Sequence, residues 1–288
     1  MYPARFRYEA PRSLDEALDL LRTYGDGAKV LAGGQSLIPM VKLRFASPEM
    51  LVDINNIPSL DYHREEAAGT LAVGALCRHV DLEHSVLLGE RRPLMVSAAP
   101  LIADPIVRNR GTLVGSLCHA DPQGDWASVM LALDGEIVAV SAAGRRVIPM
   151  SDFVTGPFQT ALLPGELAIE ARVPAPKGTP AGRYLKLERR VGDFATVGVA
   201  VAVETSGGKV TRAGIALTGV GPNNIKVVEA EQVLVGNALD AATVEEAARL
   251  AAEAAKPRTD HRGSAAYKRH VVRTFVVRAL ESSVLVAA

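Results

Sequence analysis

The sequence predicts an α+β protein of more than one domain, and three observations indicate this class. The chain has 288 residues, 48% hydrophobic and 22% charged, so it can bury a large core and form two or three domains of about 100 to 200 residues each. A well-capped amphipathic helix near the N-terminus is followed by short apolar runs of strand length. Towards the C-terminus, two long strands precede two helices, an order typical of α+β rather than parallel α/β layouts.

The N-terminal elements follow from caps and periodicity. Ser13 is the expected N-cap of the first helix, Glu16 is its capping-box partner, and Gly25 marks the end of the helix. From there the apolar patterns predict, in order, strands at residues 30–32, 50–54 and 70–75, helices at residues 93–103 and 125–133, and strands at residues 136–141 and 146–149.

A segment rich in proline and glycine divides the chain. Residues 174–182, PAPKGTPAG, suit neither a helix nor a strand, and we place the main domain boundary there. Beyond this linker, strands are expected at residues 195–204 and 210–219, and helices at residues 242–255 and 262–279. The C-terminal part therefore reads as strands followed by helices.

Composition and charge argue against several classes of function. The 32 Lys and Arg residues balance the 32 Asp and Glu residues, so no net field attracts nucleic acid or an anionic membrane, and no nucleic-acid partner is expected. The N-terminus lacks the pattern of a signal peptide, and no apolar run approaches the ~20 residues of a membrane span, which makes the cytoplasm the expected location. Cys77 and Cys118 form no CxxC pair, so any iron–sulfur cluster is expected on another subunit.

Two glycine-bearing turns are the main candidates for ligand binding. They are AGGQS at residues 32–36 and GTLVGS at residues 111–116. Glycine permits a positive φ and removes the Cβ that would hold a ligand away, so successive N–H groups can converge on an anion such as a dinucleotide pyrophosphate. The alternative is that each segment is only a tight turn. The candidate residues are Ala32, Gly33, Gly34, Gln35, Ser36, Gly111, Thr112, Leu113, Val114, Gly115 and Ser116.

Polar residues cluster around the second turn. Asp104 and Asp121 each precede a proline and are expected to fix turns, whereas Asp125 is a candidate acceptor for ribose hydroxyls. A metal site formed by His119, Asp121 and Asp125 is a weaker alternative, because the spacing is irregular and no second histidine supports it. A ribose-binding carboxylate beside a phosphate-binding turn suits a nucleotide cofactor.

Three further segments carry weaker signals. The segment HVDLEH, with His79 and His84, does not match HExxH and is expected to lie on a solvated helical face. Residues 219–224, GVGPNN, are expected to form the turn at the end of a strand. Residues 189–198, RRVGDFATVG, form either a loop with ion pairs or a loop that presents an acid and an aromatic ring to a planar ligand.

A family resemblance is carried by three motifs in order along the chain: AGGQSLIPMVKLR at residues 32–44, RNRGTLVGSLCHADPQGD at residues 108–125, and RRVGDFATVG at residues 189–198. Together they resemble the FAD-binding medium subunit of the molybdenum hydroxylase, or xanthine dehydrogenase, family. Within this family the chain is most similar to the aerobic carbon monoxide dehydrogenase branch. The likeness spans almost the whole sequence and continues through residues 262–280.

This resemblance implies a particular fold and cofactor. Residues 1–176 would form a vanillyl-alcohol-oxidase-type (PCMH-like) FAD-binding domain with subdomains at about residues 1–56 and 57–176. Residues 177–288 would form a C-terminal α+β domain of the carbon monoxide dehydrogenase flavoprotein type. Noncovalent FAD would lie between the subdomains, with its pyrophosphate in the two glycine turns. Beyond the turns, the resemblance implies FAD contacts from Ile102, Asp125, Lys186, Asp193 and Phe194.

The chain departs from the family pattern at two positions near the expected cofactor. Phe194 stands where this branch usually has tyrosine, so the ring is kept and the hydroxyl is lost. Val114 stands where the family more often has glycine. That substitution would put a Cβ near the cofactor and leave the N–H of Gly115 as the main contact in this turn.

The function implied by the resemblance is an electron relay rather than substrate chemistry. A large subunit with a molybdenum cofactor would oxidise carbon monoxide with water to carbon dioxide, and a small subunit with two [2Fe–2S] clusters would pass the electrons to this FAD and on to a quinone. The complex would be a dimer of heterotrimers in the cytoplasm, with contact to the inner face of the membrane through its acceptor or a partner. No residue of this chain is expected to be a catalytic acid, a catalytic base or a metal ligand.

Other functions stay open at this point. Because the large subunit sets the substrate, the same chain would equally serve a hydroxylase for an N-heterocycle, a purine or an aldehyde. The non-enzyme alternative is a nucleotide-binding scaffold module that holds FAD without redox turnover. A free-standing FAD oxidase is disfavoured, because the expected turns contain no residue suited to covalent flavin attachment.

Overall fold

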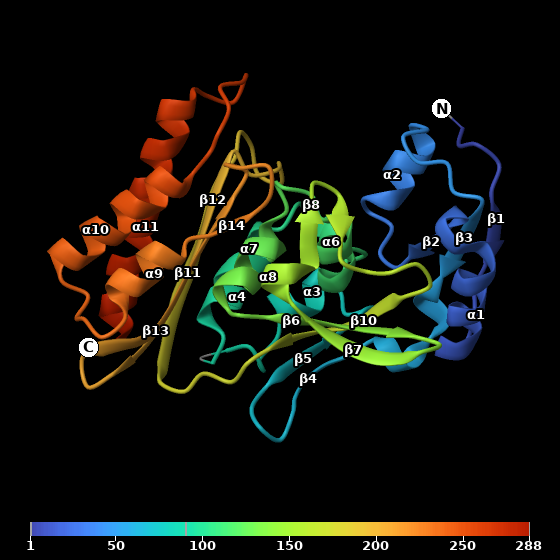
Figure 1. The fold of residues 1–288 in the computed structure, drawn as a ribbon, viewed down its shortest axis with the longest axis horizontal. Helices are drawn as coiled ribbons and strands as arrows, with labels where there is room; N and C mark the ends of the chain where they lie inside the picture. The colour runs from blue at the N-terminus through green and yellow to red at the C-terminus, as the bar shows by residue number, and fades with distance from the viewer. Residues whose placement is uncertain (1, 90, 288) are drawn as a thin grey trace.

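The computed structural model describes residues 2–89 and 91–287, with side chains described up to residue 283. In this part of the chain the strands form four sheets, and helices cover the larger ones (Figure 1). The strands are β1 (Arg7–Glu9), β2 (Ala28–Leu31), β3 (Met50–Asp53), β4 (His63–Glu65), β5 (Leu71–Gly74), β6 (Glu136–Ser141), β7 (Gly144–Pro149), β8 (Val154–Gly156), β9 (Gln159–Thr160), β10 (Leu167–Val173), β11 (Thr179–Leu187), β12 (Val197–Ser206), β13 (Lys209–Thr218) and β14 (Ile225–Lys226). The α-helices are α1 (Leu14–Tyr24), α2 (Leu37–Lys42), α3 (His79–Glu83), α4 (Pro93–Ala98), α5 (Pro105–Arg108), α6 (Leu113–His119), α7 (Asp125–Ala132), α8 (Met150–Phe153), α9 (Val228–Leu234), α10 (Ala241–Ala254) and α11 (Ala265–Ala287).

The N-terminal unit is a small parallel sheet of strand order β1-β3-β2, against which α1 packs its apolar face. Ser13 caps α1 by accepting a hydrogen bond from the N–H of Glu16, and Gly25 ends the helix at φ 49°, as predicted. The reciprocal half of the capping box is absent in this case, because the Glu16 carboxylate accepts from the N–H of Arg12 instead. The first glycine turn then joins β2 to α2 at the edge of this unit.

The central unit is an antiparallel sheet of order β4-β5-β10-β6-β7. Helix α6 packs against β5 and β10, and α7 lies between α6 and the C-terminal sheet (Figure 1). The hairpin β8-β9 lies beside α6. The expected strands at residues 70–75, 136–141 and 146–149 and the helix at 125–133 are confirmed here, whereas the central strand β10 was not predicted.

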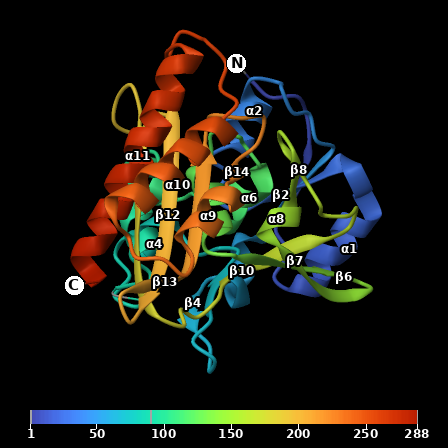
Figure 2. The same ribbon diagram turned by 60° about the vertical axis from the view of Figure 1, so that its left-hand side comes forward.

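The C-terminal unit is an antiparallel sheet of order β11-β12-β13-β14 between two layers of helices (Figures 1 and 2). Helices α9 and α11 pack on one face and carry α10, and helices α4 and α7 pack on the other. Strand β12 serves both faces, because its odd-numbered valines from 197 to 203 join one core cluster while Ala200 and Ala202 join the other. Helix α7 approaches so closely that a Cβ on Gly214 would lie 1.8 Å from the carbonyl oxygen of Ala132. The division into domains at residue 176 stays a prediction.

The α+β class is confirmed, with three corrections to the predicted elements. The linker at residues 174–182 was drawn too long, because β11 begins at Thr179 and contains Pro180 and Gly182. Proline is tolerated there because β11 is the edge strand of its sheet. The helix predicted at residues 93–103 ends at Ala98 and continues only as a 3₁₀ turn, Ala99–Leu101. The last predicted helix begins three residues later than expected and continues to Ala287.

Candidate functional site

The two glycine turns, far apart in the sequence, lie in direct contact. A Cβ built on Gly33 would lie 2.3 Å from the carbonyl oxygen of Arg110 and 2.7 Å from the Cα of Gly111. These distances are too short for any carbon contact, so only glycine at position 33 allows the turns to approach this closely. The structure thus brings together the two segments that the sequence predicts to bind a phosphate group.

The first turn presents hydrogen-bond donors that have no partner. Gly34 adopts φ 73°, and the N–H groups of Gly33, Gly34 and Gln35 donate to no other described residue. The carbonyl groups of the same turn are occupied, because the Gln35 side chain donates to Gly33 at 3.2 Å and the N–H of Ile38 donates to Gly34 at 3.0 Å. Free donors beside occupied acceptors form a concave nest that suits an anion.

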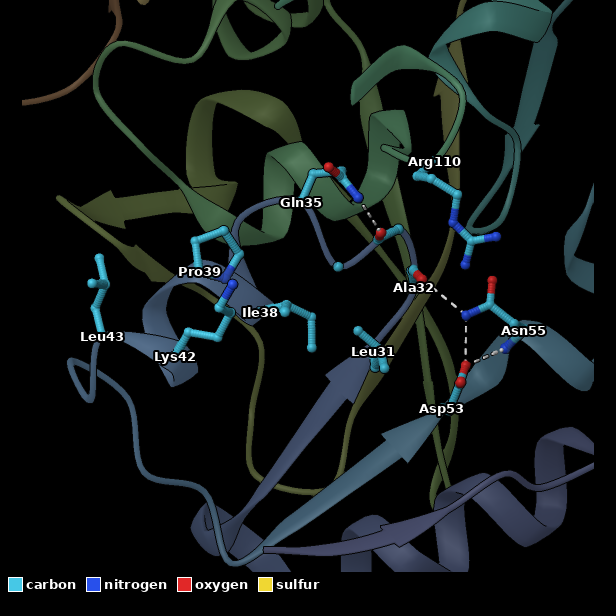
Figure 3. A pocket seen from close by; sticks show the side chains of 12 residues that line it. Leu31, Ala32, Gln35, Ile38, Pro39, Lys42, Leu43, Asp53, Asn55 and Arg110 are labelled. Carbon is cyan, nitrogen blue, oxygen red and sulfur yellow. Dashed lines mark hydrogen bonds between the residues drawn. The ribbon is translucent and has the colours of Figure 1, made fainter. Parts of the chain in front are cut away.

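A cavity of about 510 Å³ opens beside this turn (Figure 3). Its walls are the end of β2, the turn itself, one face of α2, the end of β3 with Asp53 and Asn55, and Arg110 from the second turn. Lys42 and Arg110 form no ion pair with any other residue in the described part of the chain. The cavity therefore combines free N–H groups with two cations that form no ion pair with any described carboxylate, although Asp53 also lines its wall.

Several residues at this cavity were not predicted as site residues. Asn55 donates from Nδ2 to the carbonyl of Ala32 at 2.9 Å, and its own N–H donates to Asp53 Oδ1 at 3.0 Å (Figure 3). The signal that was available is position: Asp53 and Asn55 stand at the carboxyl end of a strand parallel to β2, and such ends meet at one edge of a sheet. Arg110 directly precedes Gly111 and was therefore also identifiable.

In the second turn, several N–H groups have partners within the chain. Thr112 caps α6 by accepting from the N–H of Gly115 at 3.1 Å, and the N–H of Gly111 donates to Val107 at 2.7 Å. The Gly115 N–H thus has a partner within its own turn, and its contact with the cofactor stays a prediction. Val114 is buried in the apolar core, and the predicted approach of its Cβ to the cofactor also stays a prediction.

A buried histidine supports the second turn from behind. The backbone N–H of His79 donates to the carbonyl of Gly111 at 2.9 Å, and its Nδ1 accepts from Trp126 Nε1 at 3.1 Å. Burial lowers the pKa of His79 to about 4, because the charged ring would lose its hydration. The prediction of a solvated helical face is wrong for this residue, since α3 turns its ring into the core.

Asp125 and Lys186, the predicted acidic and basic flavin contacts, form a buried ion pair where the C-terminal sheet meets α7. Lys186 Nζ lies 3.0 Å from Asp125 Oδ2, 2.9 Å from the carbonyl of Leu101 and 3.4 Å from Glu188 Oε2. The Tyr184 hydroxyl donates to Asp125 Oδ1 at 2.6 Å. Burial raises the pKa of Asp125, and Lys186 and Tyr184 oppose that rise only in part. Both oxygens of Asp125 thus have partners within the chain, and its contacts with ribose hydroxyls or with the flavin stay predictions.

The remaining predicted residues lie on the loop at residues 189–194 and the segment under it. Gly192 adopts φ 87°, and a Cβ there would lie 3.3 Å from the carbonyl of Ala103, so the loop packs on the segment that contains Ile102. Asp193 is ion-paired within the loop and Phe194 is half exposed. Ile102 is buried, which leaves only a small part of its side chain open to any ligand.

The geometry fits a dinucleotide such as noncovalent FAD at the first turn. Free N–H groups suit its pyrophosphate, glycine at position 33 lets the second turn approach the first, and the cavity volume lies within the ~300 to 1,000 Å³ of ordinary ligand sites. Asp104 and Asp121 accept from backbone N–H groups two or three residues ahead and fix turns, as predicted. Within residues 2–89 and 91–287, no group of three His, Cys, Asp or Glu side chains is placed to hold a metal ion, and no helix has the length and apolarity to cross a bilayer.

Known proteins of similar sequence and structure agree with this reading. Residues 4–176 match the family model of the FAD binding domain in molybdopterin dehydrogenase, and residues 183–283 match that of the CO dehydrogenase flavoprotein C-terminal domain. The chain is 42% identical to the carbon monoxide dehydrogenase medium chain of Hydrogenophaga pseudoflava over 98% of both sequences. It is 40% identical to subunit alpha of the 6-hydroxypseudooxynicotine dehydrogenase complex of Paenarthrobacter nicotinovorans, over 97% of this chain and 95% of that one. A solved structure of carbon monoxide dehydrogenase from Hydrogenophaga pseudoflava superposes with a TM-score of 0.95 at 43% identity, over 99% of each chain.

Proposed function

The chain belongs to the family of FAD-binding subunits of molybdopterin dehydrogenases, and from this premise we propose that it is the FAD-carrying electron-transfer subunit of an aerobic carbon monoxide dehydrogenase. When bound, FAD supplies an acceptor that takes up electrons and releases them to a further acceptor. The observation that carries the proposal is the meeting of the two glycine turns at one cavity with free N–H donors, in a chain related over its whole length to a carbon monoxide dehydrogenase medium chain.

The contribution of this chain is binding and positioning. The N–H groups of Gly33, Gly34 and Gln35 would hold the pyrophosphate through charge-assisted hydrogen bonds, each worth roughly 1.5 to 3 kcal/mol. Lys42 and Arg110 would offset the two phosphate charges in the same cavity. Further contacts, proposed from the family resemblance, are Ala32, Ser36, Ile102, residues 111–116, Asp125, Lys186, Asp193 and Phe194.

We place the chain in a complex with a large molybdenum-cofactor subunit and a small subunit that carries two [2Fe–2S] clusters, assembled as a dimer of heterotrimers. The reaction CO + H₂O → CO₂ + 2 H⁺ + 2 e⁻ would supply the electrons, and a quinone would receive them. Cys77 and Cys118 are free cysteines, which supports clusters held by another subunit. A quinone acceptor would bring the complex to the inner face of the cytoplasmic membrane.

The test is the visible absorption spectrum of the chain purified with its natural partners. We expect FAD that acid releases without proteolysis, and bleaching of its absorption when carbon monoxide is added. The same complex assembled with a Gly33→Ala chain is the control, and we expect it to lack flavin and to show no bleaching. An intact wild-type complex without flavin would contradict FAD binding, whereas FAD that carbon monoxide leaves oxidised would contradict only the substrate.

A second candidate is the medium subunit of a hydroxylase for an N-heterocycle, favoured by the 40% identity to the 6-hydroxypseudooxynicotine dehydrogenase subunit. Purine and aldehyde hydroxylases are variants of this alternative. Bleaching by 6-hydroxypseudooxynicotine, with none by carbon monoxide, would favour it. A nucleotide-binding scaffold module is expected to keep its FAD oxidised with every electron donor.

A further inference from the structure

We propose that Asn55 and Arg78 form a side-chain bridge that fixes the two glycine turns relative to one another and thereby positions the first turn for a pyrophosphate. Neither residue belongs to either glycine turn, and the bridge is separate from the direct contact between Gly33 and Gly111. The inference rests on the proposed FAD function and assigns these two side chains a positioning role in it.

The bridge is a continuous chain of three hydrogen bonds. Asn55 Nδ2 donates to the carbonyl of Ala32 at 2.9 Å, and Asn55 Oδ1 accepts from Arg78 Nη2 at 2.5 Å. Arg78 Nη1 then donates to the carbonyl of Arg110 at 2.7 Å. The two carbonyls occupy equivalent places, since each belongs to the residue immediately before the first glycine of its turn. One amide and one guanidinium therefore connect the backbones of both turns.

The bridge also controls the direction of a donor. A trans peptide is planar, with its C=O and N–H pointing in opposite directions. Fixing the carbonyl of Ala32 through Asn55 therefore fixes the N–H of Gly33, which is one of the three free donors of the first turn. At the second turn, the carbonyl of Arg110 is the atom against which Gly33 packs, so Arg78 also determines where that wall stands.

Both bridging residues make further hydrogen bonds that hold them in place. Asn55 Nδ2 also donates to Asp53 Oδ1 at 2.5 Å, and the other oxygen of Asp53 accepts from the Tyr8 hydroxyl at 2.7 Å. The backbone N–H of Arg78 donates to Asp81 Oδ2 at 2.9 Å in the cap of α3. These additional hydrogen bonds restrict both side chains, so the side chains can fix the backbone carbonyls that they bind.

The charges around the bridge point to an anionic ligand. Arg78 lies close enough to the guanidinium of Arg110 to be repelled by it, and burial together with this repulsion lowers the pKa of Arg78. Within the described residues, Arg110 has no carboxylate partner and lines the cavity. The two guanidinium groups repel one another when the cavity is empty. A phosphate bound in the cavity would reduce this repulsion, because it supplies the missing negative charge.

The experiment uses the full chain freed of flavin, with FAD binding measured by fluorescence quenching and ADP binding by calorimetry. ADP is the probe for the pyrophosphate alone, because it lacks the isoalloxazine ring. Asn55→Ala and Arg78→Met are each expected to weaken both ligands roughly 10- to 100-fold, since each breaks the bridge once. The double variant is expected to lose no more affinity than the single variant that binds less tightly, because the two residues act as one unit. Arg78→Lys keeps the charge, yet it should lose affinity like Arg78→Met, since one ammonium cannot replace the planar fork.

Arg92→Met is the matched control. Arg92 is a buried arginine that, like Arg78, donates to a backbone carbonyl, that of Gly69 at 2.7 Å, and it forms no hydrogen bond with either turn. We expect this variant to lower the unfolding temperature of the flavin-free chain while changing FAD affinity less than about twofold. Unchanged affinity in Asn55→Ala and Arg78→Met, or an equal loss in Arg92→Met, would overturn the bridge. A wild-type chain that binds ADP and no FAD would overturn the proposed function alone, and one that binds neither would overturn both.

Discussion

The cavity at the first glycine turn and the Asp125–Lys186 pair at the C-terminal sheet are both rich in polar groups, yet they use them differently. At the cavity, three N–H groups lack partners among the described residues, and Lys42 and Arg110 form no ion pair with any described carboxylate. At the pair, a buried ammonium meets a buried carboxylate, and Tyr184 completes the carboxylate's hydrogen bonds. Unpaired groups of one sign bind a ligand, whereas donors and acceptors that satisfy one another hold two parts of a fold together.

The hydrogen bonds around Asp125 extend across the junction between units. The Tyr184 hydroxyl oxygen also lies 3.3 Å from Thr218 Oγ1, Thr218 donates to Ser128 at 2.6 Å, and Asn224 donates to Ser128 at 2.8 Å. These side chains come from β11, β13, α7 and the segment before β14. The network therefore ties the C-terminal sheet to α7, and the comparison can be tested by breaking each cluster in turn.

The largest effect is expected at the buried pair. Lys186→Met leaves the Asp125 carboxylate without its cation in a buried site, so the free energy of unfolding should fall by about 3 to 5 kcal/mol at pH 7. The loss should be smaller at pH 5, because protonation of Asp125, whose pKa is already raised, removes the uncompensated charge. Urea unfolding of the flavin-free chain at both pH values measures this.

A surface cluster provides the control for that variant. Arg249 pairs with Glu246 and Glu253 on the exposed face of α10, and Arg249→Met should leave the stability nearly unchanged. Adding Asp125→Leu to Lys186→Met should recover much of the lost stability, because no unpaired charge is then buried. A double variant as unstable as Lys186→Met would show that the network acts through something other than charge.

The next effect is expected at the cavity and on affinity rather than stability. Gly33→Ala places a Cβ against the carbonyl of Arg110, so the turns must separate, and FAD affinity should fall roughly 100-fold, about 2.7 kcal/mol. Gly27→Ala is the matched control in the same unit, because its Cβ would lie at an ordinary 3.4 Å from Glu49. The flavin-to-protein absorbance ratio after dialysis reports the difference; equal ratios in the two variants would contradict the role of the contact.

The smallest effect concerns the buried histidine behind the second turn. The pKa of His79 is lowered from 6.5 to about 4 in the folded chain, so below pH 6.5 the unfolded state binds a proton that the folded state does not. Stability from this residue is therefore complete above pH 6.5 and is lost as the pH falls towards 4, with a loss of about 2 kcal/mol at pH 5. His79→Gln keeps an acceptor for Trp126, and its unfolding free energy should change less between pH 7 and pH 5. An identical pH dependence in both proteins would rule out His79 as its source.

Elements with a strong local signal were predictable, and those specified by distant contacts were not. The first helix has its own cap at Ser13 and a terminating Gly25, so its limits follow from the sequence alone. Strand β10 is fixed by pairing with β5 and β6, which lie far from it along the chain, and this pairing leaves no local mark in the sequence. Pro180 was interpreted as part of a linker because proline is excluded from central strands. It is compatible with an edge strand, but the position of β11 at the edge depends on the final strand order.

The same distinction applies to the candidate site. Glycine pairs in the sequence identified both turns, because the required backbone freedom is a local property. Other features of the site depend on how separate segments pack. These are the contact of Gly33 with Arg110, the burial of His79, and the hydrogen bond from the Gly115 N–H to Thr112. Asn55 and Arg78 have no recognisable motif at all, since their role arises only when both turns are in place.

The double-sided burial of strand β12 has a consequence for how members of this family exchange parts. Its valines belong to the layer under α9 and α11, while Ala200 and Ala202 belong to the core on the side of α4 and α7. Gly214, on the neighbouring strand, already touches Ala132 of α7. A protein recombined near residue 178 would combine the C-terminal sheet of one family member with helix α7 of another. The contacting surfaces of the sheet and of α7 must therefore come from the same parent, although they lie far apart in the sequence.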